Sequence, residues 1–326
     1  MSGSGTTPRS VLVTGGGGFL GTSVVSGLAA AGHRVVSTDL RLPGGDGGAH
    51  GVEHVVMDVT DAAQVRAVIG AHRPEVVVHL ASIVTPGKGS TRDLEYDVDV
   101  NGSRHVLRAC LEHGVRRVVV SSSGAAYGYH RDNGAAHDGW LREDDPVRGN
   151  VEFAYSHHKR LVEEELAELR CDHPELEQVV LRIGTILGER VDNQITALFE
   201  RRRLLRIRGA DSPFVFVWDT DVAAVIQRAV DAEQTGVFNV AGDGALGVDE
   251  IARRLGRPTL VVPEPLLRGV LAVAHRVGLS PYGPEQTRFL QYRPVLDNTR
   301  LKEVFGYTPS KTSAEAFEAW RAARGL

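Results

Sequence analysis

A tyrosine and a lysine four residues apart, Tyr155 and Lys159, have side chains suited to acid/base chemistry. Residues at this spacing lie on the same face of a helix, so the phenol and the ammonium can address one point in space. A lysine cation beside a tyrosine favours the phenolate and lowers the pKa of the phenol from its reference of about 10. The same spacing also occurs on ordinary amphipathic helices, so the pair gains meaning from the elements that position it.

A glycine-rich turn near the start of the chain has the form of a dinucleotide-binding loop. The turn follows the apolar run 10–14, precedes a helical pattern, and reads Thr14-Gly15-Gly16-Gly17-Gly18-Phe19-Leu20-Gly21. Gly15 permits a sharp turn, Gly18 lets backbone N–H groups approach a pyrophosphate, and Gly21 lets the helix pack close to the sheet. Four successive glycines can also form a flexible linker, but a linker is not followed at once by a helix.

An acidic residue closes the next predicted strand, 33–39. Asp39 stands at the position where a carboxylate can accept hydrogen bonds from both ribose hydroxyls of an adenosine and repel a 2′-phosphate. This favours NAD over NADP as the cofactor, although Arg41 can also reach a 2′-phosphate. The alternative role of Asp39 is to cap a turn or a helix.

Strands and helices alternate along the first half of the chain. Apolar runs predict further strands at 53–59, 75–82, 117–123 and 178–183, and helical patterns cover 93–113 and 155–170. This alternation predicts an α/β fold with a doubly wound parallel sheet of the Rossmann type, which binds its ligands at the carboxyl ends of the strands.

The regular alternation stops after Gly184. We therefore expect an NAD-binding domain over 10–184 and a smaller α/β region over 185–326 that mainly binds substrate, with segments at about 214–241 able to return to the main sheet. In this second region the sequence predicts helices at 192–206 and 219–232 and strands at 214–218 and 236–240. A substrate pocket is expected between the two parts of the chain.

Several motifs together resemble the extended short-chain dehydrogenase/reductases of the NAD-dependent epimerase/dehydratase family. The resemblance covers Val11 to about Tyr307. Its carriers are the glycine loop, Asp39, Asp58-Val59, His79-Leu80-Ala81, Asn101-Gly102, Ser121-Ser122-Ser123-x-x-x-Tyr127-Gly128, Tyr155-x-x-x-Lys159 and Trp218-Asp219-x-Asp221-Val222-Ala223. The fifth strand and the following helix meet at the carboxyl edge of the sheet, so Ser123, Tyr155 and Lys159 are expected in one site.

The resemblance implies a role for each of these residues. Tyr155 exchanges a proton with a substrate hydroxyl or carbonyl, and Ser123 orients that oxygen. Lys159 binds the nicotinamide ribose and, together with the charge of the oxidised ring, lowers the Tyr155 pKa. The implied cofactor contacts are Gly15, Gly18, Phe19, Leu20, Gly21, Asp39, Asp58, Val59, Leu80, Ala81, Ser82, Asn101, Tyr155, Lys159 and Ile183. Asn101 can instead cap a helix.

The sequence departs from the family pattern where a substrate diphosphate is usually held. Sugar-nucleotide enzymes of this family carry an arginine before the segment that begins at Trp218, but the stretch 212–218 has no cation. Arg202, Arg206 or Arg208 can compensate from the neighbouring predicted helix. The aromatic residues of the stretch keep a sterol-like or other apolar alcohol open as an alternative substrate to a sugar nucleotide.

The motifs indicate hydride transfer at a hydroxyl-bearing carbon and leave the net reaction open. An epimerase returns its hydride and a dehydrogenase releases it, with the same three residues. The residues around Ser123 lack the acidic pair typical of dehydratases. A non-catalytic NAD(P)-binding sensor or scaffold is the alternative from another class, although such proteins commonly lose Tyr155 or Lys159.

The bulk properties limit the partners of the protein. The chain has 326 residues, 42% hydrophobic residues and a formal net charge of −4, so nothing favours nucleic acid as a partner. Residues 1–9 lack an apolar run and no window reaches a membrane-spanning length, so we expect a cytoplasmic protein without a membrane partner. The two cysteines lack metal-ligand spacing, and no metal is expected. The family usually pairs helices such as 93–113 and 155–170, which predicts a homodimer.

Overall fold

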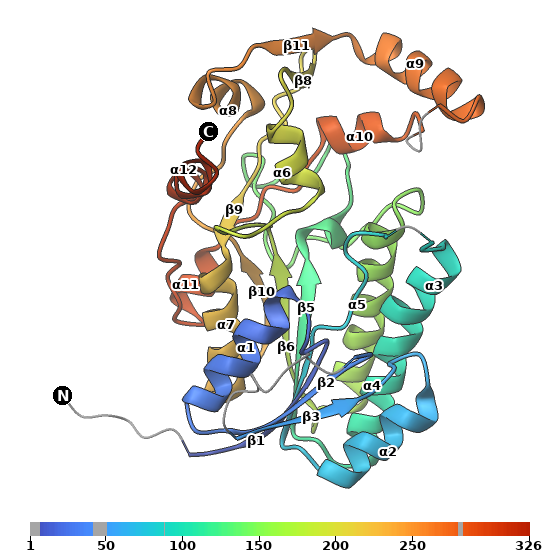
Figure 1. Ribbon diagram of the computed structural model, residues 1–326, viewed down its shortest axis with the longest axis vertical. Helices are drawn as coiled ribbons and strands as arrows, with labels where there is room; N and C mark the ends of the chain where they lie inside the picture. The colour runs from blue at the N-terminus through green and yellow to red at the C-terminus, as the bar shows by residue number, and fades with distance from the viewer. Residues whose placement is uncertain (1–6, 42–50, 88, 280–282) are drawn as a thin grey trace, which may run out of the picture.

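A parallel sheet of seven strands forms the centre of the molecule (Figure 1). The structure is a computed structural model that describes residues 7–41, 51–87, 89–279 and 283–326. The strands follow the order β10-β6-β5-β4-β1-β2-β3, and every neighbouring pair is parallel. They are β1 (Ser10–Thr14), β2 (Arg34–Asp39), β3 (Val52–Val56), β4 (Val76–His79), β5 (Arg117–Ser123), β6 (Glu177–Ile183) and β10 (Gly236–Val240). The predicted doubly wound fold is confirmed.

The order of the strands reverses between β1 and β4. The chain places β2 and β3 on one side of β1, and then β4, β5 and β6 on the other. Loops that leave the carboxyl ends of β1 and β4 therefore run in opposite directions and leave a crevice between them, which is where doubly wound sheets bind ligands. The glycine loop and Leu80 follow these two strands.

Helices cover both faces of the sheet (Figure 1). On one face lie α1 (Phe19–Ala30) and α7 (Asp219–Asp231), and on the other lie α2 (Ala62–His72), α4 (Gly102–Glu112) and α5 (Ala154–Asp172). The predicted helix 93–113 consists of α3 (Arg92–Tyr96), the π-helical turn η1 (Asp97–Asn101) and α4. A π turn changes which residues of a helix share a face.

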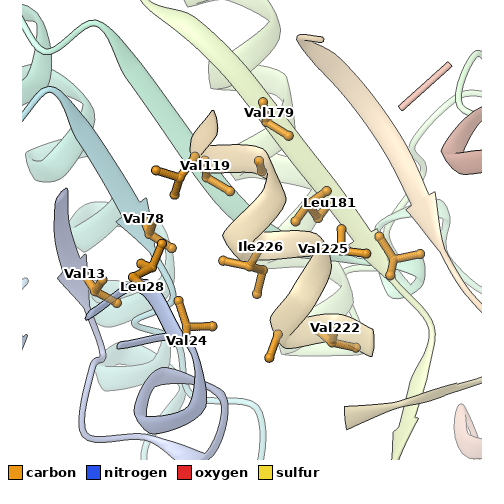
Figure 2. Close-up of a cluster of buried hydrophobic side chains, with 14 of the residues drawn as sticks. Val13, Val24, Leu28, Val78, Val119, Val179, Leu181, Val222, Val225 and Ile226 are labelled. Atoms are coloured by element: carbon orange, nitrogen blue, oxygen red, sulfur yellow. The ribbon is translucent and has the colours of Figure 1, made fainter. Parts of the chain in front are cut away.

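Apolar side chains from α1, α7 and one face of the sheet form a continuous core (Figure 2). Val13, Leu28 and Ile226 in this cluster are fully buried, and Val119 is 1% exposed. A second cluster packs α2, α4 and α5 against the opposite face of the sheet. Removal of these apolar surfaces from water is the main force that holds the layers together.

The rest of the chain forms a smaller region above the carboxyl ends of the strands (Figure 1). It contains two parallel pairs of short strands, β7 (Thr185–Leu187) with β9 (Phe216–Trp218) and β8 (Leu204–Ile207) with β11 (Thr259–Val262). Its helices are α6 (Gln194–Phe199), α8 (Val248–Arg254), α9 (Glu264–Arg276), α10 (Gln286–Gln291) and α12 (Ser313–Ala323). The helix α11 (Thr299–Glu303) lies lower, against β10. Within the described ranges, no helix has the length and apolar character needed to cross a bilayer.

Three element ends predicted from the sequence are wrong, and one of them belongs to the fourth strand, which ends at His79 instead of at residue 82. The helix expected at 192–206 ends at Phe199, and the chain then forms β8, because pairing with β11 overrides the helical preference of the Arg/Leu-rich segment. The third strand ends at Val56 instead of at residue 59, so Asp58 lies in the following turn. Residues 1–6 of the N-terminal segment lie outside the described residues.

The core of Figure 2 predicts a large effect for Ile226→Ala. This change removes a fully buried side chain from α7 and leaves a cavity against the sheet. We expect the free energy of unfolding to fall by about 2–5 kcal/mol, measured by urea denaturation. Val270→Ala on α9, where the side chain is 55% exposed, is the control and should change stability little. Equal losses in both variants would contradict the assigned core.

Candidate active site

The first turns of α5 pack against the end of β5, and this contact brings the three predicted catalytic residues together. Ser123 lies close enough to Tyr155 to lower the pKa of its phenol, and its Oγ accepts a 3.1 Å hydrogen bond from the backbone N–H of Ala125. Lys159 Nζ donates a 2.9 Å hydrogen bond to the carbonyl oxygen of Ser121. The same Nζ lies 5.4 Å from the centre of the Tyr155 ring. Phenol, hydroxyl and ammonium therefore form one cluster at the carboxyl edge of the sheet.

A buried ion pair one turn further along fixes α5 to the sheet. Arg182 on β6 donates hydrogen bonds of 2.9 Å from Nε and 2.7 Å from Nη2 to Glu163 Oε2. Ser122 Oγ donates to the same carboxylate, and Arg182 Nη1 donates to the Tyr127 hydroxyl at 2.7 Å. Because Lys159 and Glu163 are four residues apart on α5, the contact that holds Glu163 also sets the height of Lys159 against β5.

The pKa of Tyr155 is displaced in the direction opposite to the one expected from its lysine neighbour. Burial raises the pKa of Tyr155 to about 12, and the Ser123 hydroxyl beside it lowers it in part. The carboxylate of Asp99 raises it further, and Lys159 does not offset these effects. The expected lowering also relied on the charge of an oxidised nicotinamide, so for the cofactor-bound enzyme it stays a prediction.

A single cleft of about 590 Å³ connects the glycine loop to the catalytic cluster. Of the predicted residues, those that line it are Gly15, Gly18, Phe19, Leu20, Gly21, Leu80, Ser82, Ser123, Tyr155, Lys159 and Ile183. The cleft continues from Tyr155 into the smaller region, where Phe214, Phe289 and Arg293 form its wall. The glycine loop, the catalytic cluster and the smaller region thus face one continuous space.

The glycine loop fits the approach of a diphosphate. Gly15 has a φ of 68°, and a Cβ there would lie 2.8 Å from the backbone nitrogen of Ala81. A Cβ at Gly21 would lie 2.1 Å from the Gly15 carbonyl oxygen, so the start of α1 can pack on the loop only without a side chain. Gly18 is the N-cap of α1, and the free N–H groups of that helix end face an anion readily.

Asp39 lies beside this loop at the end of β2. Its Oδ2 accepts a 3.0 Å hydrogen bond from the Gly17 N–H, and its Oδ1 accepts one of 2.7 Å from the Leu40 N–H. The carboxylate therefore points toward the glycine loop, although it is not among the residues that line the cleft. Its predicted contact with the adenosine ribose stays a prediction.

Four other predicted cofactor contacts lie away from the cleft lining. Asp58 Oδ1 accepts hydrogen bonds from the backbone N–H and the hydroxyl of Thr60. Val59 is 7% exposed and packs in the core cluster that includes α4. Ala81 packs behind the glycine loop and donates its N–H to Thr14 Oγ1. Asn101 bonds within its own helical segment, where its Nδ2 donates a 2.8 Å hydrogen bond to Asp97 Oδ1. Their roles toward the cofactor remain predictions.

Arg293 is the cation that the sequence did not reveal. Its Nη1 donates a 2.8 Å hydrogen bond to the Ser212 carbonyl oxygen, and its Cζ lies 3.9 Å from the Phe214 ring centre and 5.0 Å from that of Phe289. Its buried Nε has no hydrogen-bond partner among the described residues. Burial lowers the pKa of Arg293 to about 9, so the group is still charged at neutral pH.

The three arginines predicted to compensate for the missing cation do not do so. Arg202, Arg206 and Arg208 are absent from the cleft lining. Arg206 lies on β8 and forms a 3.0 Å ion pair with Asp249. Arg293 instead reaches the stretch 212–218 from a distant part of the chain, and no spacing in the sequence links the two.

Comparison with known proteins identifies the family. The model of the NAD-dependent epimerase/dehydratase family matches residues 11–241. The chain belongs to this family. A UDP-glucose 4-epimerase of Mycolicibacterium smegmatis is 30% identical over 332 residues, which cover 93% of this chain and 95% of that protein. An uncharacterised protein of Mycobacterium tuberculosis is 27% identical over 328 residues, covering 98% of this chain and 85% of that protein.

The same fold occurs in solved structures. WbmG of Bordetella bronchiseptica, crystallised in complex with NAD and UDP, superposes with a TM-score of 0.72 and 20% identity over 98% of this chain and 94% of that one. Membership of the NAD-dependent epimerase/dehydratase family makes the protein an NAD-dependent enzyme of the short-chain dehydrogenase/reductase type. NAD is the cofactor that the glycine loop fits.

The close packing at Gly21 predicts the effect of Gly21→Ala on cofactor binding. The added Cβ would push against the Gly15 carbonyl oxygen and open the loop. We expect the affinity for NAD to fall by about tenfold or more, equivalent to about 1.4 kcal/mol, in calorimetric titration. Gly269→Ala on α9 is the control, because a Cβ there meets nothing within 4 Å. Unchanged NAD affinity in Gly21→Ala would argue against this loop as the diphosphate site.

Proposed function

We propose that this enzyme transfers a hydride between NAD and a hydroxyl-bearing carbon of a nucleoside-diphosphate sugar, with Tyr155 as the acid/base. The observation that carries this proposal is the single cleft that joins the glycine loop, the Ser123–Tyr155–Lys159 cluster and the buried Arg293. A cofactor site, a proton-transfer group and an anion-binding cation are thereby aligned along one path.

Tyr155 performs the proton step in this proposal. As the phenolate, in the cofactor-bound enzyme, its oxygen would take the proton of the substrate hydroxyl when that carbon is oxidised, and as the phenol it would return that proton when the carbonyl is reduced. Ser123 lies beside Tyr155 and can donate a hydrogen bond to the same substrate oxygen, which would hold that oxygen within reach of the phenol. Because burial raises the Tyr155 pKa, the phenol is protonated before the cofactor binds.

Lys159 has two tasks at the cofactor end of the cleft. Its Nζ spends one of three donors on the Ser121 carbonyl, so the remaining donors can bind ribose hydroxyls. Its positive charge stabilises the Tyr155 phenolate as the proton leaves. NAD supplies the hydride acceptor and donor, and the protein contributes binding, orientation and electrostatics.

Arg293 supports a nucleotide sugar over an uncharged alcohol. A buried guanidinium with an unsatisfied Nε gains most from an anionic group that can accept charge-assisted hydrogen bonds. The relatives point the same way, because one is a UDP-glucose 4-epimerase and WbmG was crystallised with UDP. The aromatic wall of Phe214 and Phe289 favours the alternative, an apolar alcohol, and the test below separates the two.

Two further parts of this proposal are the net reaction, epimerisation or dehydrogenation, and the oligomeric state of the protein. Mass spectrometry of the denatured protein distinguishes an epimerase, which retains its NAD, from a dehydrogenase, which releases it. A homodimer formed through the segments 93–113 (α3, η1 and α4) and 155–170 (α5) also stays a prediction.

Tyr155→Phe tests the catalytic role directly. Loss of the hydroxyl should lower kcat by about 100- to 10,000-fold on a sugar nucleotide, while NAD binding persists. Turnover is followed by the absorbance of NADH or by chromatography of the product sugars. Tyr292→Phe, outside the cleft lining, is the control. If no substrate shows turnover that depends on Tyr155 while NAD still binds, the non-catalytic sensor is the better description.

Arg293→Met tests the substrate class. The change keeps an apolar side chain between the two phenylalanine rings but removes the charge, so KM for nucleotide sugars should rise about tenfold or more. The affinity for NAD should stay within error, and Arg206→Met is the control for loss of a charge outside the cleft. An unchanged KM for nucleotide sugars, with better turnover of uncharged alcohols, would favour the apolar substrate.

A further inference from the structure

A chain of buried hydrogen bonds links β1 and β4, the two strands that border the cofactor crevice. His79, the last residue of β4, is 3% exposed and bonds through both ring nitrogens. Its Nδ1 lies 2.7 Å from Thr14 Oγ1 at the end of β1, and its Nε2 lies 3.0 Å from Ser103 Oγ on α4. Thr14 Oγ1 also accepts a 3.3 Å hydrogen bond from the Ala81 N–H. One imidazole therefore joins the strand before the glycine loop, the loop after β4 and a helix that covers the sheet.

The partners of His79 determine which of its nitrogens carries a hydrogen. Ser103 has one hydroxyl hydrogen and donates it to the carbonyl oxygen of Asp99, four residues earlier, which can only accept. Ser103 can therefore only accept from the ring, so Nε2 carries a hydrogen. In a neutral ring Nδ1 is then bare and accepts the hydroxyl hydrogen of Thr14.

The imidazole of His79 is neutral in this environment. Burial and then the charge of Lys159 lower its pKa to about 3, although Asp99 acts in the opposite direction. A cationic ring would also donate from Nδ1 to Thr14, which already accepts the Ala81 N–H, and would leave the Thr14 hydroxyl hydrogen without an acceptor in the described part of the chain. All the hydrogen bonds therefore run in one direction, from the Ala81 amide through the ring to α4.

The residues that His79 orders lie directly against the glycine loop. A Cβ at Gly15 would lie 2.8 Å from the backbone nitrogen of Ala81, so the loop after β4 packs against this glycine. Leu80 and Ser82, on either side of Ala81, line the cleft. A change in the Thr14 hydroxyl that displaces Ala81 would therefore move both the glycine loop and the cleft lining.

The backbone of His79 reaches the catalytic end of the same cleft. Its carbonyl oxygen accepts a 3.2 Å hydrogen bond from Ser121 Oγ, and the Ser121 carbonyl in turn accepts one of 2.9 Å from Lys159 Nζ. We propose that His79 is a positioning residue for NAD: its neutral ring, with the hydrogen on Nε2, holds Thr14 against Ala81 and so fixes the cleft between the glycine loop and the catalytic cluster.

Nitrogen-15 NMR reports the tautomer directly. The chain has 13 histidines, and the set of ring signals that disappears in His79→Gln belongs to His79. At neutral pH we expect long-range proton–nitrogen correlations to show a protonated Nε2 and a bare Nδ1. A hydrogen on Nδ1, in the other tautomer or in the cation, overturns the proposal.

Two substitutions of His79 separate its two hydrogen bonds. An asparagine amide lies near the position of Nδ1, so His79→Asn keeps an acceptor for Thr14 but does not reach Ser103. A glutamine amide lies near the position of Nε2, so His79→Gln keeps a partner for Ser103 and leaves the Thr14 hydroxyl without its acceptor. We expect the Kd for NAD to rise about fivefold or more in His79→Gln and to stay within about twofold of the wild type in His79→Asn. Calorimetric titration into nucleotide-free protein measures both values.

Equal losses of NAD affinity in the two variants would show that His79 acts only by packing, and they would overturn the proposal. An unchanged Kd in His79→Gln would overturn it as well. His72→Gln is the matched control, because this imidazole on α2 also bonds through both nitrogens but lies outside the cleft lining; its Kd should equal that of the wild type. If a His79 variant does not fold, as judged by circular dichroism, Thr14→Val and Thr14→Ser replace the pair. The valine loses the hydroxyl and should raise the Kd, whereas the serine keeps it and should not.

This test is independent of the proposed function. The tautomer and the affinity for NAD are both measured without a substrate, so a protein without Tyr155-dependent turnover can still show the role of His79. Conversely, Tyr155-dependent turnover together with an unchanged Kd in His79→Gln would leave the proposed reaction intact and remove His79 from cofactor binding.

Discussion

The buried contact between Arg182 and Glu163, completed by the Ser122 hydroxyl, is the interaction on which the geometry of the active site depends. It fixes both the rotation and the height of α5 against the ends of β5 and β6. Side chains four residues apart share a helix face, so the same register brings Tyr155 and Lys159 to the sheet edge. A buried ion pair gives uncertain net stability, because desolvation offsets the attraction, but breaking it strands a charge. We infer that its main contribution here is to hold one arrangement of helix and strands.

The cleft that results carries two buried cations at separate places. Lys159 is hydrogen-bonded to one carbonyl oxygen and Arg293 to another, and neither forms a direct ion pair with a carboxylate within the described part of the chain. Carbonyl oxygens orient these cations without neutralising them. In a site with little water, such charges attract anions much more strongly than surface charges do. The chain has a net charge of −4, yet its cleft is suited to negatively charged molecules.

Much of the fold could be predicted from the sequence, because strands buried on both faces are continuous apolar runs and the glycine loop needs particular residues at particular positions. The proximity of Ser123, Tyr155 and Lys159 could be expected as well, because the end of the fifth strand and the start of the following helix lie at one edge of the sheet. Predictions failed where distant segments decide the outcome: pairing with β11 turns the end of the expected helix 192–206 into β8. Arg293 reaches the cleft from a segment without any motif. The π turn ending at Asn101 changes the helical phase, so Asp99 bonds to the loop after β4 while Asn101 bonds along its own helix.

The last strand of the sheet shows how the two parts of the chain depend on each other. β10 pairs with β6 although the chain builds β7, β8 and β9 of the smaller region between them, and α7 covers the sheet on its return. A protein truncated after Gly184 would lack both elements, leaving β6 as an open edge and the apolar face at Val119 and Leu181 in water. The cofactor-binding half is therefore not a separable module. A chimera that takes its substrate-binding region from a relative would therefore need two junctions, one after β6 and one before α7 and β10, so that these two elements still cover the sheet.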